Sequence, residues 1–527
     1  MRWLSRPGGT PLSPGARPWR LDPWLLIFLA AGLILRCLYL DLPMAEAHRW
    51  RQITNADIAR NFYEGSLNIF RPQVSWGGPG NALVGMEFPL LQWLAGVLFH
   101  LTSNITLVCR GISIAFSLGT VGAIYGLGTR LYGRPAGRAA AFLLALSPSF
   151  VFFGRTFISD VPMVFFSVAA IWGFVAYADT GDRRAAAWGT VCAALACLVK
   201  IPAVIIFAPI AWLAWTHRRW RALLDPIWIA GVALPLIATV LWYWYADVLF
   251  HQTGLGQAIW HSSGGYAPSV SIAAGPFTGI SHWSTLDQIR DPEFYKLMVI
   301  RAWNLHLTPP GFALALVGWL VYWNSRRRIA IDLWFGSAVL FILVSAEGNR
   351  NHEFHQLPAL PPAALFFGMA AAPAFDGAWL RRWAGIRFAP ALALAALLTI
   401  GLIGFAQSEV IRDFYRPDRL DWTSIHAGQA IEAVVPRNET VIVVEYEKFG
   451  GNSPMVLFWA HRKGWSFDMT AITPHVVERL RRQYKARYFA TTMWPEIEAR
   501  QPVLADYLRA QKRLPVDVTG TAVFEIY

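Results

Sequence analysis

Charged side chains that could support transfer chemistry are confined to a few short segments of an otherwise apolar chain. The first of these segments, EAHRWR, begins at Glu46 and includes His48, Arg49 and Arg51. Carboxylates serve as general bases, and cations beside them hold anions such as phosphate. Glu46 follows the first apolar stretch by only a few residues, where a lipid head group would be presented. This segment is therefore a candidate functional site at the membrane surface.

Two further carboxylates occur at the borders of apolar segments. Asp160 lies in RTFISDVPM, in an otherwise apolar stretch. Charges at bilayer depth are costly and tend to be functional or paired, so Asp160 is either catalytic or ion-paired with Arg155. Glu87 lies in GMEFP at the start of another apolar run, where it either supports catalysis or caps a helix.

A third polar segment, EGNRNHEFHQLP, contains Arg350, His352 and His355. Two histidines at i, i+3 beside a glutamate could bind a metal or grip phosphate. His-x-x-His without a certain third ligand is a weak metal signal. The residues that would bind a metal, if one is present, are Glu46, Asp160, His352 and His355.

The composition indicates that these segments are positioned by a membrane protein. The chain has 527 residues, of which 55% are hydrophobic and 15% charged, with 26 Trp and 33 Phe. Soluble surfaces need roughly a quarter to a third charged residues, and aromatic residues favour membrane interfaces. The net charge of +13 comes from short basic clusters between apolar runs, a pattern typical of cytoplasmic loops and not of a nucleic-acid-binding stripe. The four cysteines lie in apolar segments and are interpreted as packing residues.

Apolar segments long enough to span a bilayer, some of them marginally, are 22–40, 105–131, 139–153, 158–178, 185–199, 203–216, 227–246, 309–323, 329–346, 355–371 and 388–406. Placing the basic loops inside gives an unbroken alternation of sides. The predicted fold is an α-helical polytopic membrane protein with about 11–13 transmembrane helices and a small extracytoplasmic α/β domain. The predicted parts are a cytoplasmic segment 1–21, a transmembrane domain 22–406 with outer loops 41–87 and 247–297, and an outer domain 407–527.

The first outer loop contains two less certain elements. The apolar run 88–101 is short for a span, so it is either a re-entrant or interfacial helix, or a crossing accompanied by a split of 105–131 into two. Asp57, Arg60, Asn61 and Glu64 recur at helical spacing opposite an apolar side, which indicates either a helix along the membrane surface or a solvated loop with ordinary interfacial charges.

The tail beyond residue 406 has the pattern of a small α/β domain. Predicted helices cover 427–435 and 475–484, and predicted strands cover 440–445, 487–492 and 522–527. It contains neither GxGxxG nor a Walker A motif, so nothing in it predicts a nucleotide site.

At these residues the chain resembles the GT-C glycosyltransferases. The acid after the first span, the helix ending ARNFYEG, the GMEFP segment, and the turns RTFISDVPM and HEFHQLPALPP are the similar features. The resemblance covers roughly residues 20–405 and points to the family 39, PMT-like branch. That branch includes protein O-mannosyltransferases, lipid A aminoarabinose transferases and RgtA/B/C/D-like bacterial enzymes.

The resemblance implies a membrane transferase that moves a sugar from a polyprenyl-phosphate donor to a lipid, glycan or protein acceptor. The reaction would take place on the outer face of a bacterial inner (plasma) membrane and modify lipopolysaccharide or another envelope glycan. It implies no certain cofactor and leaves open a divalent metal, Mg or Mn. The family roles fall on Glu46 as general base or acceptor-orienting acid, on Asp160 as second-loop acid and on Glu87 in the donor region. His352 and His355 fall in the turn that contacts the lipid phosphate.

Two positions depart from the family pattern. Many relatives have Asp at Glu46, and several have Lys where this chain has Phe88. The donor phosphate would then be held by Arg49, Arg51, Arg350 or the histidines.

Two other classes of function compete with the transferase. A transporter or flippase of lipid-linked sugars would place ionisable residues at mid-bilayer, whereas here they gather at span ends. Lys200 is the main interior exception, and the topology places it near the outer end of its span, where it could face a lipid phosphate. The other alternative is a non-catalytic envelope assembly protein whose tail binds a partner.

Overall fold

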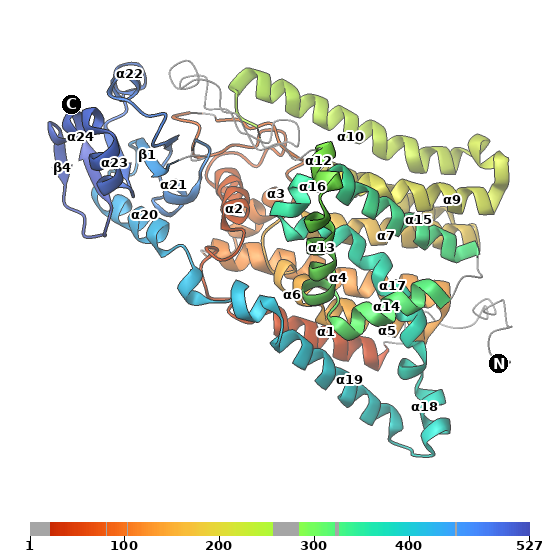
Figure 1. Cartoon of the computed structure of the whole chain (residues 1–527). Helices are drawn as coiled ribbons and strands as arrows, with labels where there is room; N and C mark the ends of the chain where they lie inside the picture. The colour runs from red at the N-terminus through yellow and green to blue at the C-terminus, as the bar shows by residue number, and fades with distance from the viewer. Residues whose placement is uncertain (1–21, 81, 103, 257–283, 322–325, 448–450) are drawn as a thin grey trace. The chain divides into compact units, whose positions relative to one another are not determined.

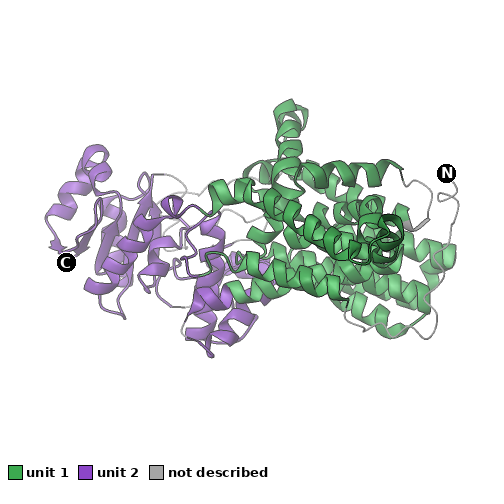
Figure 2. Ribbon diagram, turned by 90° about the horizontal axis from the view of Figure 1, so that it is seen from below, with its two compact units in different colours: residues 1–40, 110–240, 282–415 green, residues 41–109, 241–281, 416–527 purple. Residues whose placement is uncertain are grey.

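The computed structural model of the chain describes residues 22–80, 82–102, 104–256, 284–321, 326–447 and 451–527 (Figure 1). It contains two compact units that do not follow chain order (Figure 2). Unit 1 comprises residues 1–40, 110–240 and 282–415, and unit 2 comprises residues 41–109, 241–281 and 416–527. The predicted segment 1–21 and residues 257–283 of the predicted outer loop lie outside the described residues.

Helices occupy every predicted span. The α-helices that belong wholly or mainly to unit 1 are α1 (Pro23–Arg36), α4 (Ile105–Tyr132), α5 (Arg134–Leu146), α6 (Pro148–Phe153), α7 (Asp160–Thr180), α8 (Arg183–Val199), α9 (Phe207–Arg218), α10 (Pro226–Thr253), α12 (Leu286–Arg290), α13 (Pro292–Arg301), α14 (Pro309–Val321), α15 (Arg326–Val344), α16 (Ala346–Asn351), α17 (Leu360–Ala371), α18 (Gly377–Ala384) and α19 (Ala389–Ala406). Short 3₁₀ or π turns join them: η1 (Ile201–Ile206), η2 (Arg219–Leu224), η3 (Ala302–His306), η4 (Glu353–Ala359), η5 (Ala372–Phe375) and η6 (Val410–Phe414).

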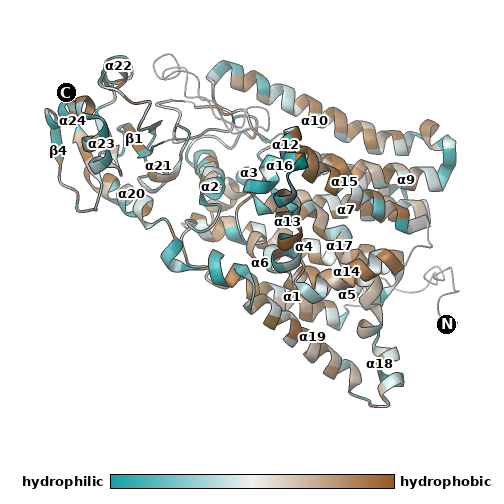
Figure 3. Cartoon of the chain, in the orientation of Figure 1, coloured by the Kyte–Doolittle hydropathy of each residue, from teal (hydrophilic) through white to brown (hydrophobic). Residues whose placement is uncertain are grey.

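The long helices have the composition of membrane spans. Among the described residues, six helical segments are long and apolar enough to cross a bilayer by length and composition. Hydrophobic residues predominate along α10, α15 and α19 (Figure 3), and α19 buries little of its surface inside the protein. A helix that exposes apolar residues in this way requires lipid around it.

Helices α7 and α8 form a tight antiparallel hairpin. Gly181 ends α7 in the left-handed conformation (φ 71°), and the Asp182 side chain then caps α8 by accepting from the Arg184 N–H. The two helices meet closely at Gly173, where an added Cβ would lie 2.8 Å from the Ala185 carbonyl oxygen. A hairpin of this kind brings the start of α7 and the end of α8 to the same end of the pair.

Unit 2 contains a five-stranded mixed sheet in the order β2-β1-β3-β5-β4. The strands are β1 (Val441–Tyr446), β2 (Gly464–Asp468), β3 (Tyr488–Thr491), β4 (Lys512–Leu514) and β5 (Ala522–Glu525). Strand β1 pairs in parallel with β2 and β3, and β5 pairs antiparallel with β3 and β4. The helices of this tail are η7 (Pro417–Arg419), α20 (Trp422–Val434), α21 (Met455–Trp459), α22 (Pro474–Tyr484), α23 (Trp494–Arg500) and α24 (Pro502–Arg509).

The α/β prediction for the tail is confirmed in its main elements. Each predicted helix and strand has a counterpart in α20, α22, β1, β3 and β5, while β2 and β4 were not predicted. Strand β2 (GWSFD) contains no Val or Ile and lacks the β-branched run that marks β1.

Helix α2 (Arg49–Glu64) is a buried element of unit 2, so the predicted helix is present but the alternative of a solvated loop is wrong. Residues 52–62 of α2 are all buried. The Asp57 carboxylate accepts from the Ser75 N–H at 2.8 Å. The Arg60 guanidinium donates to the Phe458 carbonyl at 2.6 Å and lies 3.9 Å from the centre of the Phe458 ring. These partners replace water, which is why the polar side of the helix can be buried.

Helix α3 (Leu90–Phe99) shows how the short apolar run 88–101 folds. Its 10 residues extend over only about 15 Å, half of a hydrocarbon core. It packs on α2 inside unit 2, where Gln92 donates to Asn55. Because α4 is one continuous helix of 28 residues, the alternative of a split second span is wrong.

The segments that make up unit 2 are relevant to which parts of the chain lie on the same side of the membrane. Residues 41–109 and 416–527 belong to this one compact unit. Segments that pack into one folded unit outside the bilayer lie on the same side of it. The charge alternation predicts that the first loop and the tail share a side of the membrane, and this stays a prediction.

Candidate functional site

Asp160 and Lys200 form a buried ion pair at one end of the α7–α8 hairpin. The Lys200 Nζ donates to Asp160 Oδ2 at 2.6 Å, and the two side chains are 11% and 3% exposed, respectively. Asp160 is the first residue of α7 and Lys200 directly follows α8, so hairpin closure joins them across 40 positions of sequence. Two matched charges can remain buried together, whereas either one alone would be strongly destabilising.

The alternative pairing of Asp160 with Arg155 is wrong. Arg155 Nη1 donates to the carbonyl oxygens of Leu38 and Tyr39 at 3.2 and 2.8 Å. Its guanidinium also lies 4.6 Å from the centre of the Tyr415 ring. Arg155 thus fixes the end of the first span to the rest of unit 1.

The predicted histidine turn lies next to this ion pair. Phe354 is the link: its ring centre is 5.2 Å from Lys200 Nζ, it stacks on His352 at 5.1 Å, and it meets His355 edge-on at 4.7 Å. Asp160, His352 and His355 therefore gather in unit 1 around Lys200, a residue that the predicted site set lacked.

Arg301 and His306 hold the histidine turn in place. Arg301 donates to the backbone oxygens of Asn349 and Arg350 at 2.6 and 3.0 Å, and to Glu353 Oε1 at 2.9 Å. The buried His306 ring pairs with Gln356 Oε1 at 2.9 Å, and burial lowers the pKa of His306 to about 4. His306 is therefore neutral at physiological pH and contributes hydrogen bonds without a charge.

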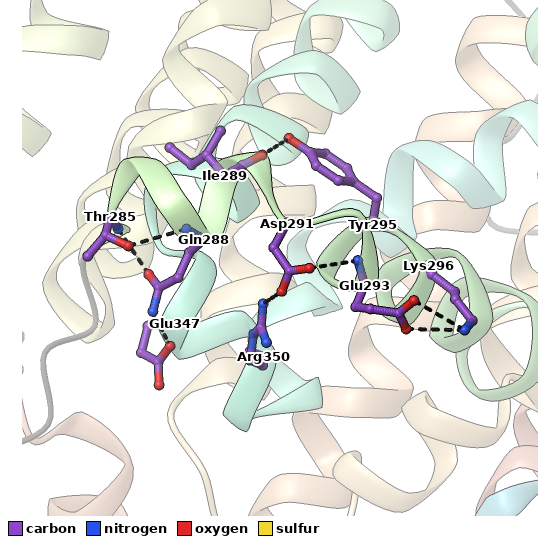
Figure 4. Close-up of polar contacts among 9 residues, drawn as sticks. All are labelled: Thr285, Gln288, Ile289, Asp291, Glu293, Tyr295, Lys296, Glu347 and Arg350. Carbon is purple, nitrogen blue, oxygen red and sulfur yellow. Dashed lines mark hydrogen bonds and ion pairs between the residues drawn. The ribbon is translucent and has the colours of Figure 1, made fainter.

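Arg350, another predicted phosphate ligand, is held by an acidic partner. Its Nη2 lies 2.6 Å from Asp291 Oδ2, at the junction of α12 and α13 (Figure 4). The hydrogen bond from Arg350 lowers the pKa of Asp291. Glu347 on the same short helix accepts from Gln288 of α12 (Figure 4). These contacts tie α16, which precedes the histidine turn, to α12 and α13.

The remaining predicted residues lie in unit 2, around the start of α2. Glu46 is buried, with 3% of its surface exposed. His48 precedes the helix in the left-handed conformation (φ 58°), which is uncommon for a side chain with a Cβ. Arg49 Nε donates to Asp421 Oδ2 at 3.1 Å, and Arg51 is half-buried.

Glu87 also belongs to unit 2, where it is half-buried directly before α3. Its neighbour Phe88 meets the Trp242 ring edge-on at 4.9 Å. The Trp242 indole N–H donates to the Met86 carbonyl at 3.0 Å. The segment is thus fixed by aromatic packing.

The donor groups that the structure describes do not fit a metal. In that part of the chain, no cluster of three or more His, Cys, Asp or Glu side chains could hold an ion. Asp160, one of the four predicted ligands, is ion-paired with Lys200.

Sequence reasoning missed two features that a local pattern could have indicated. Residues 160–180 and 183–199 are apolar segments of similar length that are joined by a short turn containing Gly181. Two such segments form a hairpin whose far ends lie together, so the pairing of Lys200 with Asp160 could have been predicted. Glu445 is an acid at the end of the run VIVVEY, and the carboxyl end of a buried parallel strand is where α/β domains bind ligands.

Comparisons with known proteins agree with this architecture. Residues 87–244 match the family model described as dolichyl-phosphate-mannose-protein mannosyltransferase. No curated protein sequence matches the chain at a significant level.

Solved structures extend the likeness to nearly the whole chain. ArnT from Cupriavidus metallidurans in the apo state is similar with a TM-score of 0.64 at 12% identity, over 95% of this chain and 97% of that one. The same protein bound to undecaprenyl phosphate gives 0.62 at 12% identity, over 95% of this chain and 97% of that one. Archaeal oligosaccharyltransferase AglB from Archaeoglobus fulgidus, in complex with an inhibitory peptide and a dolichol-phosphate, gives 0.55 at 14%, over 97% and 75%.

Fold and helix composition together define the class: a multi-pass integral membrane protein with the GT-C fold. Within that class, residues 87–244, less than a third of the chain, are similar to the protein mannosyltransferase family model.

Proposed function

We propose that the chain transfers a sugar from a polyprenyl-phosphate donor to an acceptor hydroxyl on the outer face of a bacterial plasma membrane. The observation that carries this proposal is the buried Asp160–Lys200 pair beside the histidine turn, within a GT-C fold. An ammonium held at the end of a membrane hairpin is suited to a lipid phosphate, because the lipid tail can remain in the bilayer. The similar ArnT structure bound to undecaprenyl phosphate supports this class of donor.

The proposed reaction is a substitution at the anomeric carbon. The acceptor oxygen forms a bond to that carbon while the bond from the carbon to the phosphate oxygen breaks, and the polyprenyl phosphate leaves with the electron pair. Glu46 takes the proton of the acceptor hydroxyl. Lys200 stabilises the charge that develops on the departing phosphate.

The other predicted residues have supporting roles in this scheme. Asp160 orients Lys200 through the 2.6 Å ion pair and is thus a positioning residue in this scheme. His352 and His355 are proposed to donate hydrogen bonds to the phosphate. Arg51 and Glu87 are proposed to contact the donor.

The experiment uses purified full-length protein in detergent with a panel of polyprenyl-phosphate sugars and a membrane lipid extract as acceptor. Its readout is the release of polyprenyl phosphate, which is common to all acceptors. We expect Glu46→Gln to lower the rate by about 10²–10⁴-fold, the usual contribution of a general base. Asp160→Asn should raise the donor KM as well as lower kcat, because it loosens the phosphate-binding lysine.

Matched controls remove a carboxylate from exposed positions. Glu64→Gln at the far end of α2 and Asp287→Asn on α12 should retain the wild-type rate. Full activity of both Glu46→Gln and Asp160→Asn would overturn the mechanism, while no release from any donor would overturn the proposed function.

A further inference from the structure

The carboxyl end of β1 is the topological switch point of the sheet in unit 2. Strand β1 is followed through α21 by β2 on one side and, after α22, by β3 on its other side, and both pair with β1 in parallel. Successive connections therefore leave β1 toward opposite edges of the sheet. Open α/β sheets bind ligands at a switch point of this kind.

A β-bulge at this end changes the direction of one side chain. Val444 pairs with Phe467 and Tyr446 pairs with Asp468, so Glu445 is the extra residue in the register between β1 and β2. Bulges of this kind bend a strand and redirect its side chains, and they are frequent beside functional sites.

The Glu445 side chain is buried, yet its two oxygens form no hydrogen bonds among the described residues. The residue is 6% exposed, and neither carboxylate oxygen has a donor in hydrogen-bonding geometry among the described residues. Burial raises the pKa of Glu445 to about 8, although the nearby Ser453 hydroxyl and Val456 N–H act in the opposite direction. Leaving a buried acceptor unsatisfied costs about 1–3 kcal/mol, so native proteins seldom keep one without a role.

Aromatic and charged groups surround this carboxylate. Tyr446 is half-buried, and its ring lies 5.5 Å from that of Trp50 on α2. Arg49 bonds to Asp421, and the Asp421 N–H in turn donates to the Ala45 carbonyl at 3.2 Å. The residue after Ala45 is Glu46, so within unit 2 the end of the sheet adjoins the proposed general base.

We infer that Glu445, Tyr446 and Trp50 form a subsite that binds a pyranose ring of the acceptor next to Glu46. The Glu445 carboxyl group can donate one hydrogen bond to a sugar hydroxyl and accept others from neighbouring hydroxyls, and the aromatic rings offer an apolar surface to the ring face. This inference rests on the proposed function and specifies its acceptor as a glycan, in place of a peptide or an unglycosylated lipid. The tail is then part of the acceptor site.

Saturation-transfer NMR on the full-length protein in detergent tests this assignment. The probes are methyl α-glycosides of mannose, glucose, galactose and N-acetylglucosamine, with a Ser- and Thr-containing pentapeptide as the competing acceptor chemistry. We expect at least one glycoside to bind the wild type, and its Kd to rise at least tenfold in both Glu445→Gln and Trp50→Ala. The matched control is Glu447→Gln, which removes an exposed carboxylate two positions along the chain and should bind like the wild type.

The outcomes separate this inference from the proposed function. Donor cleavage without binding of any glycoside, or glycoside binding unchanged in both variants, overturns the subsite alone. Binding of the peptide only would assign the site to a protein acceptor and also overturn it. Glycoside binding that depends on Glu445 in a protein that cleaves no donor supports the subsite and overturns the transferase.

Discussion

At the scale of the residue, the Asp160–Lys200 pair combines a structural and a proposed catalytic role. Each charge is buried and each is the other's partner. We expect Asp160→Asn or Lys200→Met alone to destabilise the protein by about 3–5 kcal/mol, because one unmatched charge remains buried. The double variant should recover much of that stability, since neither charge is left.

Activity should not recover with stability. In the double variant the ammonium proposed to face the phosphate is absent, so polyprenyl phosphate release should stay as low as in Lys200→Met. Apparent Tm in detergent and release rates, measured on all four proteins, complete the double-mutant cycle. A double variant that regains both properties would assign the pair a structural role only.

The raised pKa of Glu445 predicts that the free energy of unfolding depends on pH. The folded carboxyl keeps its proton up to a pKa of about 8, whereas the ordinary value is 4.5. Between these pH values the folded state binds more protons than the unfolded state, so the free energy of unfolding falls as pH rises. The full loss is at most about 5 kcal/mol. The groups facing this carboxyl are Asp421, Arg49, Tyr446 and Ser453.

The comparison of Glu445→Gln with the wild type isolates this effect. Below pH 4.5 the two proteins should have similar apparent Tm values, and above pH 8 the variant should be the more stable one. Parallel Tm curves over pH 4–9 would contradict the raised pKa. A variant that is more stable yet binds glycosides less well would show that the wild type retains an unfavourable residue for function.

At the scale of the element, α2 and α3 are packed more closely than their sequences suggest. A Cβ at Gly96 of α3 would lie 2.7 Å from Phe62 Cβ and 3.0 Å from the Ala59 carbonyl oxygen of α2. We expect Gly96→Val to destabilise the protein by about 1–3 kcal/mol through overpacking. Gly111→Val in α4 is the control, because no atom lies within 4 Å of an added Cβ there. Equal Tm values for the two variants would contradict the close packing of α2 on α3.

At the scale of the whole molecule, the membership of unit 2 predicts shared sidedness. An epitope inserted in the exposed turn at residues 66–68 and a reporter fused after Tyr527 should respond from the same side of the membrane. The basic loops predict that this side is the outer one. Responses from opposite sides of the membrane would contradict the grouping of the two segments in unit 2. Responses of both from the inner side would overturn only the orientation predicted from charge.

The sequence by itself determined the spans, the main elements of the tail and the candidate acids. These depend on local patterns: runs of apolar residues long enough for a bilayer, β-branched strands, and charges placed at span ends. Each pattern is a property of a continuous segment, so it can be read without knowing what that segment touches.

Only the tertiary structure decided which charges are partners and which surfaces are buried. Lys200 meets Asp160 because a hairpin closes over 40 positions, and Asp57 and Arg60 are buried because the tail and the first loop fold together. Glu445 stands out because a register shift between two strands leaves it as the extra residue. Partners distant in sequence are chosen by the packing of whole elements, so a local pattern can suggest such a pair but does not fix it.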